Sequence, residues 1–389
     1  MILALIGRAI GPVSTIVLLA YLSQYSLEFT AQFAVLVAYM QLSTAPLNPY
    51  TEHFYLKEIV AGKRRGLSEG VFGIIVLSII STVLVYLFDQ SMALVCIVPL
   101  FGIGHLFLKV GSATLRANKQ NTLALSLEFS LRPFLLLLIV ILMFSINGEN
   151  EDNLIIAFGV VGVCILILAL FLYAYVKHYV YFVNVQVKPL VTRGGSPWMF
   201  LVLGVLMVLV GQFEVFLLDK FANVEVLATY KVVMQIAAVC GVVTSLILMN
   251  NLRGLYTYSV GSAEYRGIYR DIRFKTLIIC IAFILFFLVV AMTLPLIWGK
   301  EVWVLAAVAA SIFAISSSFG PISNWFYSTD RTGVIITSLL YTLVIKSILF
   351  FTLSYLQLVN PITLILLFAC GVLVQNYFLF FIKQKNDYA

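Results

Sequence analysis

The stretch LIIAFGVVGVCILILALFLYAYV, from Leu154 to Val176, decides the class of fold, because its 23 residues include no charged side chain. A helix rises about 1.5 Å per residue, so a segment of this length crosses the roughly 30 Å hydrocarbon core of a membrane. Comparable apolar runs recur along the whole chain. The sequence therefore predicts an all-α, polytopic membrane protein.

Composition agrees with this prediction, since 62% of the residues are apolar and only 11% are charged. Soluble domains average about 45–50% apolar and about 25% charged residues, so a soluble fold is excluded. The twelve predicted transmembrane segments are Ile2–Leu22, Phe29–Pro49, Leu67–Phe88, Met92–Val110, Thr122–Ile146, Leu154–Val176, Trp198–Leu218, Val226–Met249, Thr276–Trp298, Val302–Tyr327, Gly333–Leu356 and Pro361–Ile382.

Basic residues are divided unevenly between the two sets of connecting segments. One set carries only Lys220 and Lys300. Cytoplasmic segments of membrane proteins hold an excess of Lys and Arg, so the basic set and both chain termini are expected in the cytoplasm. The net charge of +7 follows from this bias and implies no nucleic-acid partner. The basic set holds 17 of the 24 Lys and Arg: Lys57, Lys63, Arg64, Arg65, Arg116, Lys119, Lys177, Lys188, Arg193, Arg253, Arg266, Arg270, Arg273, Lys275, Arg331, Lys383 and Lys385.

The long basic connection in the middle of the chain marks the domain boundary. It contains Lys188-Pro189 and Arg193-Gly194-Gly195-Ser196-Pro197, and Gly, Pro and Ser in such clusters are typical of turns and linkers. We expect an N-terminal six-helix bundle over 1–180, a cytoplasmic linker over 181–197, and a C-terminal six-helix bundle over 198–389.

A short internal echo supports two related halves. Glu28-Phe-Thr-Ala-Gln-Phe33 follows the first predicted span, and Glu225-Val-Leu-Ala-Thr-Tyr230 follows the seventh, 197 residues later. Both read acid, two residues, Ala, one residue, aromatic. Repeated bundles are a common plan for secondary transporters, with the substrate path between the repeats. A transporter is therefore the expected class of protein.

Seven ionisable residues fall within the predicted spans. A charge at the centre of a membrane costs roughly 2.5–3.5 kcal/mol on insertion scales, so five lipid-facing cations would cost on the order of 12–18 kcal/mol. A fold retains only about 5–15 kcal/mol of net stability, so most of these charges must pair, reach the interface or face a watered interior. They are the cations Arg8, Lys109, Arg132, Lys231 and Lys346 and the acids Glu128 and Glu214.

The depth of a residue in the membrane, judged from its position within the predicted span, distinguishes residues that can reach the interface from residues that cannot. Lys109 and Lys231 lie near span ends, from which a lysine stem can reach the interface. His105 lies one turn from Lys109 on the same helical face. Arg132 lies near mid-membrane and four residues after Glu128, so the two can form a structural pair, or Arg132 can contact a ligand.

Lys346 also lies near mid-membrane, with no acid three or four residues away on its own helix. It needs an anionic guest or a partner on another helix, for which Glu214 is one candidate. Cations outnumber acids, so the interior suits an anionic ligand such as a diphosphate or an acidic sugar. We expect substrate contacts from Lys346, Arg132, Arg8, Lys231 and Lys109, and charge pairing or ion coupling from Glu128, Glu214 and His105.

Several short motifs carry a family resemblance: Gly7-Arg8 and Gly11 in span 1, Glu28 after it, Leu115-Arg116-Ala117-Asn118-Lys119, Arg132-Pro133, Asp219-Lys220, Glu225, Ala228 and Tyr230. With these motifs, the chain resembles the O-antigen (Wzx-type) polysaccharide flippases of the multidrug/oligosaccharidyl-lipid/polysaccharide exporter superfamily. The resemblance implies that a lipid-diphosphate-linked oligosaccharide, an O-antigen or capsule repeat unit on an undecaprenyl-diphosphate-type carrier, crosses the bacterial inner membrane by alternating access. It also implies H⁺ or Na⁺ as the coupling ion.

Two other functions remain open: a multidrug or other small-molecule ion-coupled exporter of the same superfamily, and a non-transporting structural membrane subunit. An enzyme is not expected, because the sequence has no phosphate loop, zinc spacing or nucleophile elbow, and its predicted outer loops are three to seven residues long. The five cysteines lie at irregular spacings within apolar runs, so no metal or other cofactor is expected.

Reporter fusions test the orientation. We expect fusions at Arg64, Arg193 and Arg266 to score cytoplasmic and fusions at Asp152 and Lys300 to score external, because the basic bias fixes the direction of every span. Paired alkaline phosphatase and green fluorescent protein fusions provide the measurement. A cytoplasmic score at Lys300 would contradict the twelve-span map.

Overall fold

A computed structural model of the chain describes residues 2–56, 65–66, 75–76, 79, 83, 92–117, 120, 123–124, 127, 130–176, 180–181, 197–221, 223–293, 298–329 and 331–387. Packing divides the chain into two compact units, Met1–Val208 and Leu209–Ala389, and each is described by itself. Most of the predicted third span and of the predicted 181–197 linker lies outside the described residues, so the predicted domain boundaries stay a prediction.

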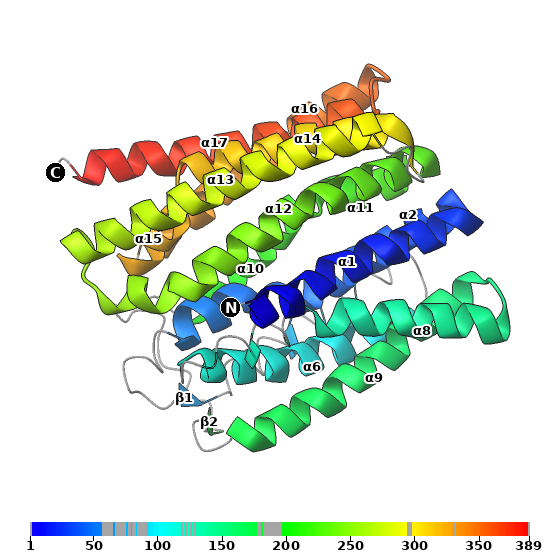
Figure 1. The fold of residues 1–389 in the computed structure, drawn as a ribbon, viewed down its shortest axis with the longest axis horizontal. Coiled ribbons are helices and arrows are strands. Elements are labelled where there is room, and N and C mark those ends of the chain that lie inside the picture. The colour runs from blue at the N-terminus through cyan, green and yellow to red at the C-terminus, as the bar shows by residue number, and fades with distance from the viewer. Residues whose placement is uncertain are drawn as a thin grey trace. The chain divides into compact units, whose positions relative to one another are not determined.

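The first unit consists of long helices and one short strand pair (Figure 1). The strands pair in parallel, with Arg65 opposite Val180 and Gly66 opposite Tyr181. Among the described elements, all others are helices. The elements are α1 (Ile2–Tyr25), α2 (Leu27–Thr44), α3 (Leu47–Pro49), the π-helical segment η1 (Tyr50–Tyr55), β1 (Arg65–Gly66), α6 (Met92–Ala117), α8 (Leu131–Asn147), α9 (Glu151–Val176), β2 (Val180–Tyr181) and α10 (Pro197–Gly211), which ends in the second unit.

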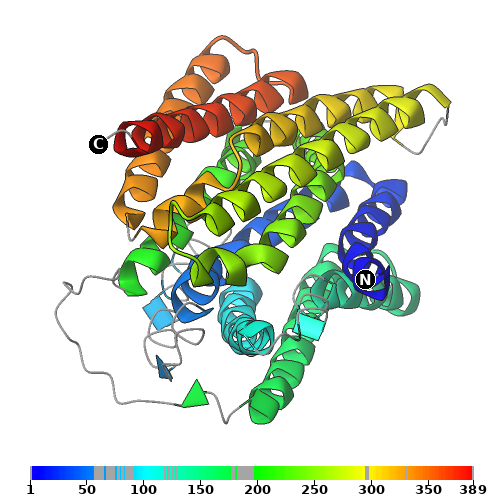
Figure 2. The ribbon, with the colours of Figure 1, turned by 60° about the vertical axis from the view of Figure 1, so that its left-hand side comes forward.

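The described elements of the second unit are all helices, which turns connect. Its α13 and α14 run side by side, as do α16 and α17 (Figures 1 and 2). Its elements are α11 (Phe213–Phe221), α12 (Val224–Thr257), α13 (Ala263–Thr293), α14 (Gly299–Ser318), α15 (Ile322–Ser328), α16 (Thr332–Tyr355) and α17 (Pro361–Asp387).

Large apolar side chains cover the outer faces of these helices. Phe171 is 72% exposed on α9, Met292 is 77% exposed on α13 and Phe381 is 61% exposed on α17. Within the described residues, seven helices are long and apolar enough to cross a membrane, or eight if α10 and α11 form one bent span. Surfaces of this kind suit lipid rather than water, so the chain is a multi-pass membrane protein.

The internal echo in the sequence corresponds to two helix starts. Ser26 begins α2, and its hydroxyl accepts a hydrogen bond from the backbone N–H of Phe29 at 3.1 Å. Asn223 begins α12, and its side chain accepts from the N–H of Glu225 at 3.0 Å. Side chains of this type satisfy the free N–H groups of a first turn. The two caps lie 197 residues apart, the same offset as the echo.

The second span extends further than the sequence predicted. We expected it to end at Pro49, but the chain stays helical through α3 and η1 to Tyr55. Pro46 caps α3 with a φ of −58°, an angle that suits the start of a helix, so this proline ends α2 without ending the helical path. In η1 the N–H of Leu56 donates to the carbonyl of Thr51, five residues earlier.

Two glycines let α6 and α9 approach closely. A Cβ added to Gly104 on α6 would lie 3.1 Å from the backbone nitrogen of Leu166 on α9. A Cβ added to Gly162 on α9 would lie 3.0 Å from the ring of Phe101 on α6. Small residues allow this kind of contact between membrane helices, so the spacing of these two helices depends on them.

Substitution of Gly104 tests this packing. We expect Gly104→Val to lower the thermal unfolding midpoint of the purified protein by several degrees, because overpacking costs about 1–3 kcal/mol. Gly267→Val is the matched control, since a Cβ at that helical position meets nothing within 4 Å. Equal unfolding midpoints for the two variants would contradict the close approach.

Candidate functional site

Lys346 on α16 is fully enclosed by protein, with 1% of its surface exposed. Its ammonium nitrogen lies 2.6 Å from Oε1 of Glu214 on α11. It also donates a hydrogen bond to the carbonyl of Val210 on α10, at 2.7 Å. Of the two solutions that the sequence left open for Lys346, the structure therefore shows the partner on another helix.

The two groups that contact Lys346 lie at a break in the span formed by α10 and α11. Helices α10 and α11 meet at an angle of 54°, with Gln212 between them. In an unbroken helix the carbonyl of Val210 would accept the N–H four residues later, and a free carbonyl in an apolar interior is costly. Lys346 donates to this carbonyl and meets the Glu214 carboxylate, so one side chain both satisfies the broken helix and balances the acid.

The surroundings of this pair are apolar and close-fitting. The rings of Phe213 and Phe368 lie with their centroids 5.5 Å and 5.7 Å from the Lys346 nitrogen. Gly371 on α17 leaves room for the lysine stem, because an added Cβ would lie 2.8 Å from its Cδ. Apart from the ion pair, neither Glu214 oxygen has a hydrogen-bond partner within the described part of the chain.

Lys231 on α12 is the second buried cation of the same unit. The sequence suggested that the Lys231 stem could reach the membrane interface. Only 6% of Lys231 is exposed, so its stem does not run along a lipid-facing surface. Among the described residues, none forms an ion pair or hydrogen bond with it. At the 197-residue offset its counterpart is Ala34, which is fully buried in α2. A lysine therefore replaces a small core residue of the first half.

A separate polar cluster lies in the first unit, between the end of the second span and α6. The Lys109 nitrogen is 3.4 Å from Oε1 of Glu52, and both side chains are almost wholly buried. His53, His105 and Arg116 are also buried, at 9%, 9% and 4% exposure. The Lys109–His105 face predicted from the sequence is thus directed into protein, where an acid meets the lysine.

Three of these residues were not predicted as part of a site. Glu52 and His53 were assigned to a loop because the second span was expected to end at Pro49. Arg116 was assigned to the basic cytoplasmic connection, whereas α6 runs on to Ala117. The sequence did contain a signal for this cluster. The polar residues Thr51, Glu52 and His53 lie between aromatic residues, in a segment that the structure shows to be helical.

The structure describes the remaining predicted site residues in part. Glu128 lies outside the described residues, so its pairing with Arg132 stays a prediction. Arg132 is half-buried in the first turn of α8, directly before Pro133. Arg8 lies on α1, and its side chain is outside the described part. Where side chains are described, no group of three His, Cys, Asp or Glu could hold a metal ion.

No protein-family model and no curated protein sequence matches the chain. Solved structures match it over nearly its full length. A mutant of the Vibrio cholerae MATE transporter VcmN is 15% identical, with a TM-score of 0.65 over 99% of this chain and 94% of that chain. The eukaryotic MATE transporter AtDTX14 is 15% identical, with a TM-score of 0.63 over 97% and 93% of the two chains.

A MOP superfamily transporter from Pyrococcus furiosus is 14% identical, with a TM-score of 0.59 over 99% of this chain and 94% of that chain. Its binding pocket is described as having reverse polarity, which suggests a different function for that transporter. The chain therefore has the MATE-like fold, and the predicted class of fold, an all-α polytopic membrane protein, is confirmed. The solved structures that share this fold include MATE transporters and a MOP superfamily transporter.

Double substitution tests the buried pair. We expect Lys346→Met to lower the abundance of the membrane-inserted protein several-fold, because removing one partner of a buried pair costs about 3–5 kcal/mol. Glu214→Gln in the same chain should restore abundance, since no unpaired charge then remains. Quantitative immunoblotting of membrane fractions measures both variants.

Lys275→Met is the matched control, because Lys275 pairs with Asp271 at 2.7 Å with about half of each side chain exposed (56% and 45%). Exposed pairs contribute about 0–1 kcal/mol, so this variant should remain abundant. An abundant Lys346→Met protein that gains nothing from the second substitution would show that the pair is not structural.

Proposed function

We propose that the chain is a flippase that moves a lipid-diphosphate-linked oligosaccharide, such as an O-antigen or capsule repeat unit, across the bacterial inner membrane by alternating access. The support is a transporter fold with an excess of buried positive charge. Within the described residues, the second unit buries Lys231 and Lys346 against one acid, Glu214. The first unit buries Lys109 beside one acid, Glu52.

Lys231 is the single observation that carries the proposal. A buried ammonium group without a counter-charge is expensive, and charges of this kind within a membrane mark substrate or ion pathways. Glu214 is already matched to Lys346, so the charge of Lys231 is left for an anionic guest. A diphosphate supplies several acceptor oxygens and negative charge, which together form strong charge-assisted hydrogen bonds.

The other predicted residues have supporting roles in this proposal. Lys346 and Lys109 are matched by acids, so they would contact the substrate only when these pairs open. Arg8 and Arg132 remain candidates for further substrate contacts, and Glu128 for pairing with Arg132. Glu214 and His105 are candidates for coupling to H⁺ or Na⁺, since both can accept a proton.

A multidrug exporter is the second candidate, because solved structures of this fold include multidrug transporters. Buried lysines disfavour a cationic drug, since like charges repel in a medium of low dielectric constant. The reverse polarity described for the Pyrococcus furiosus transporter shows that this fold is associated with more than one kind of pocket. A structural subunit that transports nothing is the third candidate, and a buried unmatched lysine gives it no support.

Substitution of Lys231 tests the proposal in proteoliposomes that contain a fluorescent undecaprenyl-diphosphate-linked oligosaccharide. We expect Lys231→Ala to lower the rate of flipping about tenfold or more, because a hydrogen bond to a charged group contributes about 1.5–3 kcal/mol. The variant should insert normally, since Ala34 occupies the equivalent place in the first half. Lys231→Arg should retain part of the rate, because it keeps the charge but changes the geometry.

Lys300→Ala, which removes an exposed lysine, is the control and should transport as the unaltered chain does. Full flipping by an abundant Lys231→Ala protein would reject the assigned role of Lys231. Drug efflux without glycan flipping by the unaltered chain would favour the exporter, and the absence of both activities would favour a structural subunit.

A further inference from the structure

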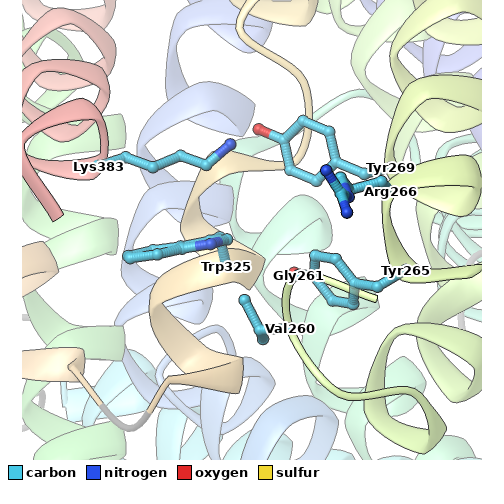
Figure 3. Close-up of a pocket in the computed structure, with 7 residues that line it drawn as sticks. All are labelled: Val260, Gly261, Tyr265, Arg266, Tyr269, Trp325 and Lys383. Atoms are coloured by element: carbon cyan, nitrogen blue, oxygen red, sulfur yellow. The ribbon is translucent and has the colours of Figure 1, made fainter. Parts of the chain in front are cut away.

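A pocket of about 390 Å³ opens within the second unit (Figure 3), and its lining residues do not include Lys231, Glu214 or Lys346. Trp325 from α15 and Lys383 from α17 lie on one side of it, and Tyr265, Tyr269 and Arg266 from α13 lie on the other. Pockets of roughly 300–1,000 Å³ are typical of small-molecule sites. The volume is therefore sufficient for a polar head group.

The aromatic wall of this pocket is held in a fixed position. Trp325 and Tyr265 are 6% and 2% exposed. The hydroxyl of Tyr269 donates to the carbonyl of Phe319 at 2.8 Å. Gly320 has a φ of +73°, and a Cβ there would lie 2.7 Å from the Tyr269 ring, so this tight turn requires glycine.

Positive charge dominates the lining. The Lys383 nitrogen lies 4.4 Å from the centroid of the Tyr269 ring, and the Arg266 side chain is exposed at the pocket. Arg331 adds a third cation nearby, with its guanidinium carbon 6.0 Å from the centroid of Trp325. These three cations come from three different parts of the second unit and gather around one pair of aromatic rings.

Acidic side chains are absent from the lining, as far as the structure describes it. Glu264, in the first turn of α13, is exposed and lies outside the lining. Asp271, further along the same helix, is paired with Lys275 at 2.7 Å. The charge of the lining is therefore positive, which favours an anionic ligand.

The position of the pocket favours a ligand from the membrane. Arg266, Arg331 and Lys383 belong to the basic face, which the positive-inside rule assigns to the cytoplasm. On the same two helices, Phe274 is 63% exposed on α13 and Tyr377 is 67% exposed on α17. Exposed apolar surface thus begins within about two helical turns of the pocket, where acyl chains would lie while a head group reached the cations.

We propose that this pocket binds the phosphate ester head group of an anionic lipid of the cytoplasmic leaflet. Arg266 and Lys383 meet the phosphate, since basic side chains close to the membrane surface recognise anionic head groups. Trp325, Tyr265 and Tyr269 pack against the glycerol part, because aromatic rings with polar edges suit the membrane interface. The site is separate from the proposed transport site at Lys231, and it does not depend on the identity of the transported substrate.

Native mass spectrometry of the full chain in detergent tests this site, with short-chain phosphatidylglycerol as the probe. We expect Arg266→Gln with Lys383→Gln to weaken phosphatidylglycerol binding about tenfold or more, because each cation near the head group contributes to binding. Arg270→Gln with Arg273→Gln is the matched control, since both side chains are exposed on α13 outside the lining and the change in net charge is the same. This control should bind almost as the unaltered chain does.

Two further probes identify the source of the phosphate ester. Phosphatidylcholine, which has no net charge, should bind at least about tenfold more weakly than phosphatidylglycerol, and soluble glycerol phosphate should not displace the lipid. Equal loss in the two double variants, or equal binding of the two lipids, would overturn the proposal. Displacement by glycerol phosphate at similar concentrations would overturn the lipid assignment in favour of a soluble phosphate ester.

A second readout guards against variants that fold poorly. With Trp198, Trp298 and Trp303 replaced by Phe, Trp325 is the remaining tryptophan of the four in the chain. We expect its fluorescence to change saturably with phosphatidylglycerol and not with phosphatidylcholine. A folded single-tryptophan protein whose emission responds to neither lipid would overturn the proposed site.

Discussion

Hydrocarbon offers no hydrogen bonds, so every backbone group within the membrane must find its partner in the protein. An unbroken helix meets this constraint by itself, and a broken one does not. The break between α10 and α11 frees the carbonyl of Val210, and Lys346 donates to it from a different helix. The same ammonium group meets Glu214. One side chain thus makes the irregular span tolerable and ties α16 to it, which explains how a charge can be kept in so apolar a bundle.

The buried charges also connect the fold to its proposed function. A matched pair holds helices together, and opening it is costly because both charges have lost their water. A buried cation without a counter-charge is costly by itself and is stabilised when an anion binds beside it. The second unit contains both kinds, the Glu214–Lys346 pair and Lys231. In the proposed function, the Glu214–Lys346 pair therefore stabilises the structure without substrate, whereas Lys231 is stabilised by the anion that enters the unit.

Much of the fold could be predicted because it follows from local patterns. Apolar runs of membrane length indicated the helices, and the 197-residue echo corresponds to the caps at Ser26 and Asn223. The site was less accessible, because pairing depends on contacts between distant segments. Glu214 could be named as one candidate for Lys346, but the freed carbonyl of Val210 had no sequence signal. Glu52 was missed because the second span was expected to end at Pro49, three residues before it.

The π-helical segment Tyr50–Tyr55 has a consequence for how this region tolerates a change in chain length. A π-helical turn closes over five residues where an α-helical turn closes over four, so it accommodates one extra residue without displacing the flanking helix. Deleting a single residue from it would therefore restore α-helical geometry and leave the helical residues on either side in register. The same deletion from a regular α-helix would rotate every residue beyond it by about 100°. Glu52 and His53 lie within the π-helical segment, so a one-residue deletion there would change which of its side chains face α6 without turning the flanking helix.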